Sequence, residues 1–414
     1  MTILAIDLGK GNSVACVYEL GTDRHRFLRV PTTPSMLGDL IAAVRPERVV
    51  IEVCPISGWV ADLVRSLNVD LQVVHGNHEG WRWRNVKRKT DRDDALKLAR
   101  LSAMNQVSEV YVPSRPIRQW RSLIQARQSV VKRLRRTKNR IRSILEREAL
   151  AWPEGKKGWS KSQLMLLWEM ARPLSEVGMD DLWRGELHVE LTLFDQALSA
   201  LATVEQRLDE LAQADSRVQL LETIPGMGRR TAEMIVAVID DPHRFRRGKQ
   251  VGCYLGLTPR QYQSGATNRQ GRISGEGHKT LRALLVEVSW LGRRWNPRLR
   301  AIYDQVHRGS PARKKIAIVA TARRLLIWCW AMLRDGRTWD EHMVAQGRFG
   351  LGEPVRRGPL RPTLSAVAHS LRSNRASDGR QGPEPQGQVE PILQSREDRE
   401  ESVTAFFKRC RCQA

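Results

Sequence analysis

The chain has 414 residues, 41% of them hydrophobic, and a formal net charge of +24. Its isoelectric point is about 10.6. This length allows two or three domains, each with its own core. So strong a positive charge excludes an ordinary metabolic enzyme and indicates a polyanionic partner, most simply nucleic acid.

The N-terminal residues lack the basic start of a signal peptide, and no unbroken apolar run of about eighteen residues occurs, so we expect no membrane partner. Six cysteines are scattered without disulfide or zinc spacing, so a reducing cytoplasm is the expected location. Several of the thirteen tryptophans lie among arginines, as at 81–84 and 293–295, where an indole can stack on a base.

Strands and helices alternate over residues 1–112. This alternation predicts an α/β domain whose partly parallel sheet is covered by helices. In chain order, the predicted elements are strands at 3–8 and 14–19, a helix at 33–44, a strand at 48–53, a helix at 58–67 and a strand at 71–75.

Two of these apolar strands carry an acid. Asp7 lies at the end of the first strand, and Glu52 lies in the strand at 48–53. A buried carboxylate without a partner is costly, and ligands gather at the carboxyl ends of strands in such sheets. The two acids therefore favour a bound cation.

Residues 89–95 have the sequence of the first turns of a helix. Thr90 is the expected N-cap, and Asp93 lies three residues on, where a capping-box acid belongs. Asp91 and Asp94 would share one helix face. Acids also suit the positive end of a helix without any ligand. Combined with Asp7 and Glu52, however, they form a set of oxygen ligands for one or two hard divalent cations.

The segment before this helix is basic. The residues expected to contact phosphates close to the acids are Arg82, Arg84, Lys87 and Arg88. His75, His78 and Glu79 could suggest a metal site, but no third nitrogen or sulfur ligand is near. A solvated loop is the expected structure there.

A long helix is predicted from Pro116 to about Glu148. Its apolar seam is Trp120, Leu123, Val130, Leu134, Ile141 and Ile144, a spacing typical of a coiled coil. No acid lies between Arg115 and Leu145, and charge of one sign this dense indicates a bound nucleic acid. The candidate contacts are Arg127, Lys132, Arg133, Arg135, Arg136, Lys138 and Arg140. The seam could also pair two protomers, or receive a second amphipathic helix of mixed charge predicted at 187–211.

Residues 221–239 resemble a helix-hairpin-helix. An apolar helix, a Pro-Gly-x-Gly turn and a second apolar helix follow one another. Gly226 and Gly228 would let backbone N–H groups approach a phosphate beside Arg229. Pro-Gly also makes ordinary links between helices.

A polar, glycine-rich loop is expected over 254–277, too long to be idle. The loop contains Ser264, in a Ser-Gly step typical of an ordinary turn, and Ser274 or Thr280 is expected to cap the helix starting near His278. Apolar helices are predicted at 280–292 and 316–333. Disorder is expected over 350–395, and a short helix at 397–407.

The motifs around Asp7, Glu52 and Asp91 together resemble the three acidic motifs of a RuvC-like, ribonuclease-H-type nuclease domain. The Lys-Thr-Asp-x-x-Asp-Ala form at 89–95 is similar to the insertion sequence 110 family of DEDD transposases, and residues 254–277 resemble that family's C-terminal domain. The basic segment before residue 89 departs from the family's plainer linker. The actin-like ATPase fold also opens with Ile-Asp-Leu-Gly, but the further glycine-rich phosphate loops that it needs are missing.

The resemblance implies a RuvC-like domain at 1–112, a basic helical stalk at 113–215, a mostly helical C-terminal transposase domain at 216–345 and a tail at 346–414. It also implies a DNA transposase or recombinase in which Asp7, Glu52, Asp91 and Asp94 bind one or two Mg²⁺ ions. In the resemblance, Ser264 matches the serine nucleophile that becomes joined to DNA, and Ser274 is the second choice.

The family further implies an element-encoded noncoding guide RNA that pairs with donor and target DNA. It implies a homo-oligomer, a dimer or tetramer, that combines the acids of one protomer with the serine of another. Two other functions stay open: a RuvC-like metal-dependent, structure-selective endonuclease in which water attacks, and a non-catalytic scaffold that binds nucleic acid.

Overall fold

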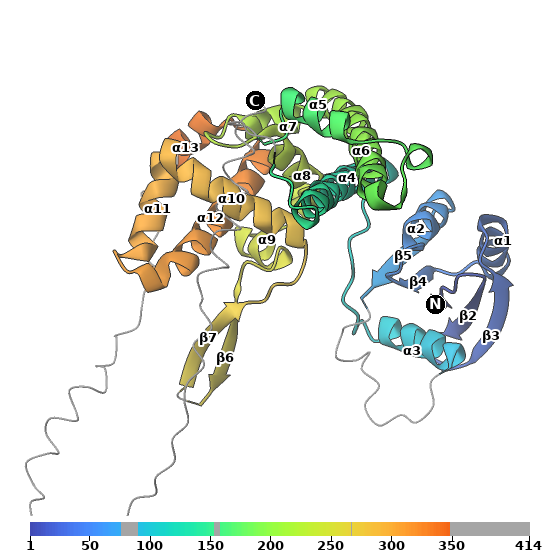
Figure 1. Ribbon diagram of the computed structural model, residues 1–414. Coiled ribbons are helices and arrows are strands. Elements are labelled where there is room, and N and C mark those ends of the chain that lie inside the picture. The colour runs from blue at the N-terminus through green and yellow to red at the C-terminus, as the bar shows by residue number, and fades with distance from the viewer. Residues whose placement is uncertain (76–89, 153–157, 266, 348–414) are drawn as a thin grey trace, which may run out of the picture. The chain divides into compact units, whose positions relative to one another are not determined.

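A computed structural model describes residues 1–75, 90–152, 158–265 and 267–347 (Figure 1). Its N-terminal part contains a five-stranded sheet in the order β3-β2-β1-β4-β5. The strands are β1 (Thr2–Asp7), β2 (Asn12–Glu19), β3 (His25–Pro31), β4 (Arg48–Glu52) and β5 (Asp70–Val74). The pairs β1–β2 and β2–β3 are antiparallel, and β1–β4 and β4–β5 are parallel. The partly parallel sheet is therefore confirmed, while β3 was not predicted.

Helices cover both faces of this sheet. On one face, α1 (Pro34–Val44) and α2 (Ser57–Ser66) bury Ile41 and Val64 in one core with Ile6 and Ile51. On the other, α3 (Asp91–Ala103) forms a second core with strand residues such as Ile3 and Val50. Alternate strand residues enter the two cores, as the pleat of a strand requires. This mixed sheet fits the expected RuvC-like domain.

Two 33-residue helices follow, α4 (Arg115–Arg147) and α6 (Leu182–Ala214), and they pack against each other along their length. The predicted seam of α4 is buried here: Ile141 and Ile144 share a core with Leu187 and Phe194 of α6, and α5 (Lys161–Met170) adds Leu167. Burial of such a side chain contributes about 1.5–3 kcal/mol. The seam is thus filled within one chain.

The remaining described residues are mostly helical, as expected. The helices are α7 (Ser216–Glu222), α8 (Arg229–Ile239), α9 (Gly248–Tyr254), α10 (Lys279–Trp295), α11 (Pro297–His307), α12 (Lys314–Asp335) and α13 (Trp339–Gly347). Three-residue 3₁₀ turns are η2 (Leu174–Glu176), η3 (Met179–Asp181), η4 (Pro242–Arg244) and η5 (Pro311–Arg313). These helices share one core, which Trp120 and Ile124 of α4 also enter. The first turns of α4 therefore belong to this core, and its later turns to the core with α6.

Residues Pro311–Asp335 are long and apolar enough to cross a membrane, with a mean hydropathy of 1.6 in their most apolar window. Charged residues interrupt this helix, so it contains no unbroken apolar run of about eighteen residues. Of that window, 61% is buried in the structure, and Leu325, Leu326 and Cys329 are completely buried. Here the helix serves as the centre of the C-terminal core.

The stretch expected to be a polar loop forms a β-hairpin, β6 (Pro259–Ser264) and β7 (Thr267–Ile273), so that expectation was wrong. At its base, Gly256 has φ +66°, and a Cβ there would lie 2.1 Å from the backbone oxygen of Glu276. Only glycine allows the chain to close so tightly before the hairpin. The predicted disorder after residue 350 and the short helix at 397–407 lie outside the described residues.

Candidate active site and nucleic-acid interface

Asp7 and Glu52 end two neighbouring strands. The parallel register pairs Ile6 of β1 with Ile51 of β4, so the two acids follow at the same sheet edge. Side chains two apart on a strand point to the same face of the sheet. Ala5 and Val50 face α3, so Asp7 and Glu52, each two residues further on, also point to the α3 side. Each is partly buried. The sheet thus brings together two carboxylates that lie 45 residues apart in the sequence.

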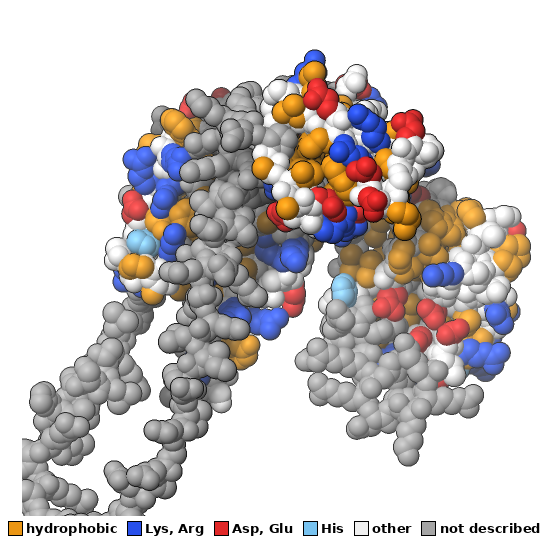
Figure 2. Space-filling model, in the orientation of Figure 1, with side chains coloured by type: hydrophobic (Ala, Val, Ile, Leu, Met, Phe, Trp, Pro, Cys, Tyr) orange, Lys and Arg blue, Asp and Glu red, His pale blue; other side chains and the backbone are white. Residues whose placement is uncertain are grey.

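The start of α3 separates its acids into different surroundings. The Thr90 hydroxyl accepts a hydrogen bond from the Asp93 backbone N–H at 3.3 Å and donates one to the Asp93 carboxylate at 2.6 Å. Asp93 is therefore the capping acid, as predicted. Asp91 is exposed, whereas Asp94 is buried beside Ala95. Figure 2 shows acidic side chains gathered on this domain, over the region of α3 and the strand ends.

The four acids offer only carboxylate oxygens, a donor set that suits a hard divalent cation. Within the described ranges, no three Asp, Glu, His or Cys side chains come close enough to form a ready metal site. The sheet edge and α3 thus supply suitable donors without a closed cage. Arg82, Arg84, Lys87 and Arg88, and the pair His78 and Glu79, lie outside the described residues, while His75 is exposed just after β5.

The basic residues predicted on α4 to bind nucleic acid differ in their surroundings. Some are bound to acids of α6: Arg127 pairs with Glu205 at 2.6 Å, and Arg140 pairs with Glu186. Lys138 lies over the rings of Trp159 and Phe194, and Arg135 is exposed. Three others are exposed and have no ion-pair partner among the described residues: Lys132, Arg133 and Arg136. Lys132, Arg133 and Arg136 can therefore contact phosphates without breaking an internal ion pair.

The predicted phosphate-binding turn joins α7 to α8. Gly228 is the N-cap of α8, and Gly226 has φ +89° with a virtual Cβ only 3.0 Å from the Cα of Gly292. Arg229 is held by Glu222 at 3.1 Å and by Asp209 at 3.4 Å. A phosphate at this turn would therefore compete with two carboxylates for that guanidinium.

A buried acid that the sequence analysis missed lies on α8. Glu233 is completely buried and pairs with Arg230 at 2.9 Å. Its Oε1 has no hydrogen-bond partner in the described part of the chain. Burial raises the pKa of Glu233 to about 7. A single acid within the apolar run 231–239 was the available signal.

Ser264 is exposed at the end of β6, paired in register with Thr267. Among the described residues its hydroxyl has no hydrogen-bonding base. His278 instead caps α10, accepting the Leu281 N–H on Nδ1 at 3.2 Å, so the expected caps Ser274 and Thr280 were wrong. Burial, together with the nearby Arg121, lowers the pKa of His278 and keeps it a neutral acceptor.

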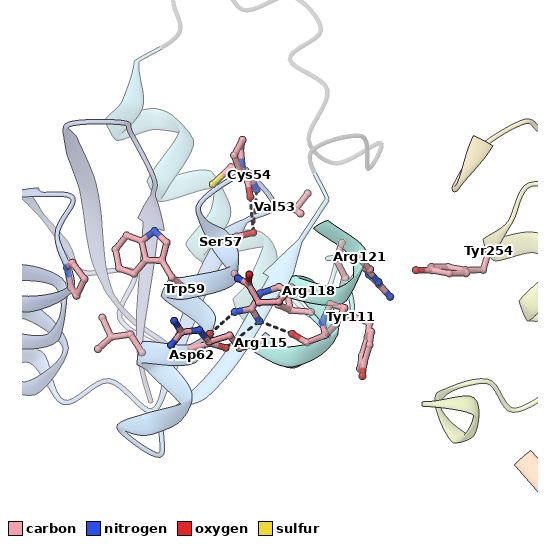
Figure 3. Close-up of a pocket in the computed structure, with 18 residues that line it drawn as sticks. Val53, Cys54, Ser57, Trp59, Asp62, Tyr111, Arg115, Arg118, Arg121 and Tyr254 are labelled. Carbon is pink, nitrogen blue, oxygen red and sulfur yellow. Dashed lines mark hydrogen bonds and ion pairs between the residues drawn. The ribbon is translucent and has the colours of Figure 1, made fainter. Parts of the chain in front are cut away.

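A cavity of about 840 Å³ lies immediately beyond Glu52, lined by the loop after β4 and the first turns of α4 (Figure 3). Arg118 crosses it to Asp62 and to the Pro113 carbonyl, the latter at 2.6 Å. Tyr111 lines it too and donates a hydrogen bond to Asp240 at 2.7 Å. Burial and this contact raise the pKa of Tyr111 to about 12. Tertiary packing alone creates this arginine- and aromatic-lined hollow.

Comparison with known proteins finds matches to two stretches of the chain, one containing the acids and one containing Ser264. A family model described as "Transposase IS116/IS110/IS902 family" matches residues 218–304, and a second, described as "Transposase" and specific to DEDD proteins of IS110 elements, matches residues 4–149. Among solved structures, a Thermus thermophilus RuvC structure covers 27% of this chain and 100% of its own at 16% identity. The TM-score of that comparison is 0.21.

Three curated relatives are similar. The "Transposase for insertion sequence element IS1111A" of Coxiella burnetii is 27% identical over 59% of this chain and 66% of its own length. The "Probable family 20 transposase" of Pseudomonas aeruginosa is 27% identical over 76% of this chain and 92% of its own. The "Pilin gene-inverting protein" of Moraxella lacunata is 35% identical over 31% of this chain and 40% of its own. The chain thus spans just under two thirds of the first relative.

Proposed function

Because the chain belongs to the insertion sequence 110 family of DEDD transposases, we propose that it cuts and exchanges DNA strands with two separate groups, an acidic edge and Ser264. The observation that carries the proposal is the pair of acids at adjacent strand ends, on the side of the sheet covered by α3. Acids so placed can hold a cation at a phosphodiester, whereas a purely structural sheet edge has no use for them.

In this mechanism Asp7, Glu52, Asp91 and Asp94 hold one or two Mg²⁺ ions. Bound Mg²⁺ would neutralise charge on the scissile phosphate and favour ionisation of the attacking hydroxyl. The four carboxylates would hold that cation, and α3, capped by Thr90 and packed on the sheet, positions Asp94 on the side of Asp7 and Glu52.

Ser264 provides the nucleophile. Its Oγ attacks phosphorus, an Oγ–P ester forms, and the bond to the leaving deoxyribose oxygen breaks as that oxygen takes up a proton. A hydroxyl at another DNA end then attacks the phosphoserine, rejoins the strand and returns the proton to Oγ. No oxidant or energy source is needed, because one phosphodiester replaces another. A serine needs activation, and the acidic edge supplies it.

The exposed basic side chains of α4, on Lys132, Arg133 and Arg136, can contact the phosphates of a structured guide RNA or of the DNA itself. The family resemblance adds donor and target DNA as partners. It also adds a dimer or tetramer, which would allow the acids of one protomer to act with the serine of another. Such a protein would act in the cytoplasm, where the DNA is.

The direct test is covalent trapping on labelled DNA carrying the element's ends. Wild-type protein should form a denaturant-resistant adduct, and Ser264→Ala should form none and should not cut. Ser274→Ala is the matched control and should keep the adduct, because Ser274 lies at the base of the hairpin. If Ser264→Ala cuts at the wild-type rate without any adduct, serine attack is wrong.

Cutting by Ser264→Ala without an adduct would favour a RuvC-like, metal-dependent endonuclease in which water attacks. One observation favours this alternative: within the described residues, Ser264 has no base beside it, and the acids belong to a different part of the chain. Products would separate the two functions, because hydrolysis leaves free ends whereas strand exchange leaves rejoined DNA.

A further inference from the structure

We propose that the β6–β7 hairpin enters the major groove of duplex DNA and that amide side chains on one of its faces contact base edges. The inference rests on the proposed function, since it takes DNA as the substrate of the Ser264 end. It adds the element and the residues that read the DNA.

The register of the hairpin separates two kinds of side chain. Gln261 pairs with Gln270, and Gln263 pairs with Asn268, so these four amides share one face. Their grouping is visible in a hydrogen bond from the Gln261 side chain to that of Asn268 at 3.2 Å. We call these residues the amide face. Ser264 belongs to the opposite face, with Tyr262, Thr267 and Arg269.

Nothing in the described part of the chain covers this hairpin. All residues of β6 are exposed, and so are those of β7 up to Arg272. An isolated two-stranded hairpin is marginally stable in water, and here neither face packs on a core. Such an element is best explained by a surface that it meets when the protein acts.

The charge of the hairpin identifies that surface as a polyanion. Between Thr258 and Gly275 the sequence has no Asp or Glu, while Arg260, Arg269 and Arg272 lie along the two strands. A hairpin with arginines and no acids can approach phosphates without repulsion. The amide face adds neutral donors and acceptors where a groove floor would lie.

The dimensions and chemistry favour the DNA major groove. That groove is about 12 Å wide and admits a two-stranded β-ribbon, and Gln or Asn can bond adenine N6 and N7 together. Residues two apart on a strand are separated by about 7 Å, roughly two nucleotide steps of 3.4 Å. The major groove of A-form RNA is too deep and narrow for side chains to read.

The two faces give the hairpin two separable tasks. Amides that face the groove floor would select the sequence, while Ser264, on the opposite face at the end of β6, points away from those base edges. Loss of the amide face should therefore change which DNA is bound without removing the nucleophile.

The test is selection of random-sequence duplex DNA by the full-length protein, followed by sequencing. Wild-type protein should enrich sites with fixed A·T pairs. The double variant Gln261→Ala/Gln270→Ala should lose preference at one or two of those pairs and bind the enriched duplex about tenfold more weakly. Replacing the adenine of those pairs by 7-deazaadenine should weaken wild-type binding to a similar degree and leave the variant unchanged. Gln206→Ala, which removes an exposed amide of α6, is the matched control and should behave as wild type.

Identical enriched sites and affinity for the double variant would overturn the inference, as would a loss seen only with a random RNA pool. The readout is binding, so it is independent of the adduct test. An unchanged preference together with a Ser264-dependent adduct would remove the base-reading hairpin and leave the proposed function intact. A changed sequence preference of the double variant, without any adduct of the wild-type protein, would keep the base-reading hairpin and remove the serine mechanism.

Discussion

The acids near the start of α3 differ in what surrounds them, and this difference separates structure from chemistry. Asp93 bonds to the capping Thr90, whereas Asp94 is buried on the side of the sheet where Asp7 and Glu52 end their strands. A residue that caps a helix contributes to folding, and a ligand contributes to the reaction. A substitution at a ligand acid should therefore reduce cleavage and spare stability, whereas a substitution at the capping acid should reduce stability and spare cleavage.

Asp7→Asn should lower DNA cleavage by at least about a hundredfold, because an amide neither carries charge nor binds a hard cation well. Nucleic-acid affinity and the melting temperature should stay near wild type. Asp93→Ala, the matched control, should cleave normally but lose about 0.5–1 kcal/mol of stability with its capping contact. Cleavage and thermal denaturation assays measure both, and normal cleavage by Asp7→Asn would contradict the metal-ligand assignment.

Glu233 predicts a pH dependence of stability. Its pKa is about 7 in the folded protein, raised mainly by burial, against an ordinary value of 4.5. Between these values the unfolded chain loses its proton first, so the unfolded state binds fewer protons and stability falls as pH rises. Below pH 4.5 and above pH 7 the contribution is constant.

Glu233→Gln should remove this component. The free energy of unfolding of wild type relative to the variant should fall by roughly 1–3 kcal/mol from pH 4.5 to pH 7.5. Denaturant titration at several pH values measures the difference, and subtracting the variant cancels other titrating groups. A difference that is flat or rises with pH would show that Arg230 keeps the carboxylate ionised throughout.

At the scale of elements, α4 has two functions along one helix. Its apolar seam and some of its arginines hold α6, while Lys132, Arg133 and Arg136 remain exposed. Ion pairs to α6 partly neutralise the helix, which explains how so many arginines can share it. The exposed residues are then the ones available to a polyanion.

Arg133→Ala/Arg136→Ala should weaken binding of nucleic acid and reduce the slope of log affinity against log salt by about 1–2, since each lost phosphate contact removes about 0.7–0.9. Arg147→Ala, on the same helix but paired with Glu186 at 2.7 Å, is the control and should leave that slope unchanged. Fluorescence anisotropy over a salt series measures the slope. Equal effects of both variants would mean that binding follows net charge rather than these positions.

At the scale of the whole molecule, the acids and Ser264 belong to different parts of the chain. If an oligomer combines them across protomers, mixing Asp91→Asn with Ser264→Ala should restore a fraction of the strand exchange that each variant lacks alone. The intact acids of one variant would then act with the intact serine of the other. Exchange assays on mixtures at several ratios measure this, and no recovery at any ratio would place acids and serine of one active site in the same chain.

The local elements on which the candidate site depends could be predicted from the amino-acid sequence. The apolar strands ending at Asp7 and Glu52, the helix capped by Thr90 and the seam of α4 all follow from side-chain periodicity and capping chemistry within short stretches. Such patterns need no distant partner, so they could be predicted. The family could also be identified, because its motifs are contiguous.

Features that depend on distant residues became apparent in the folded chain alone. It pairs Arg127 with Glu205 across two helices, buries Glu233 of α8, and forms the cavity beyond Glu52. It also forms the β6–β7 hairpin from a stretch that is polar on both faces, where no hydrophobic alternation could indicate a strand. The physical reason is the same in each case: burial and pairing depend on which surfaces meet, and no local pattern contains that information.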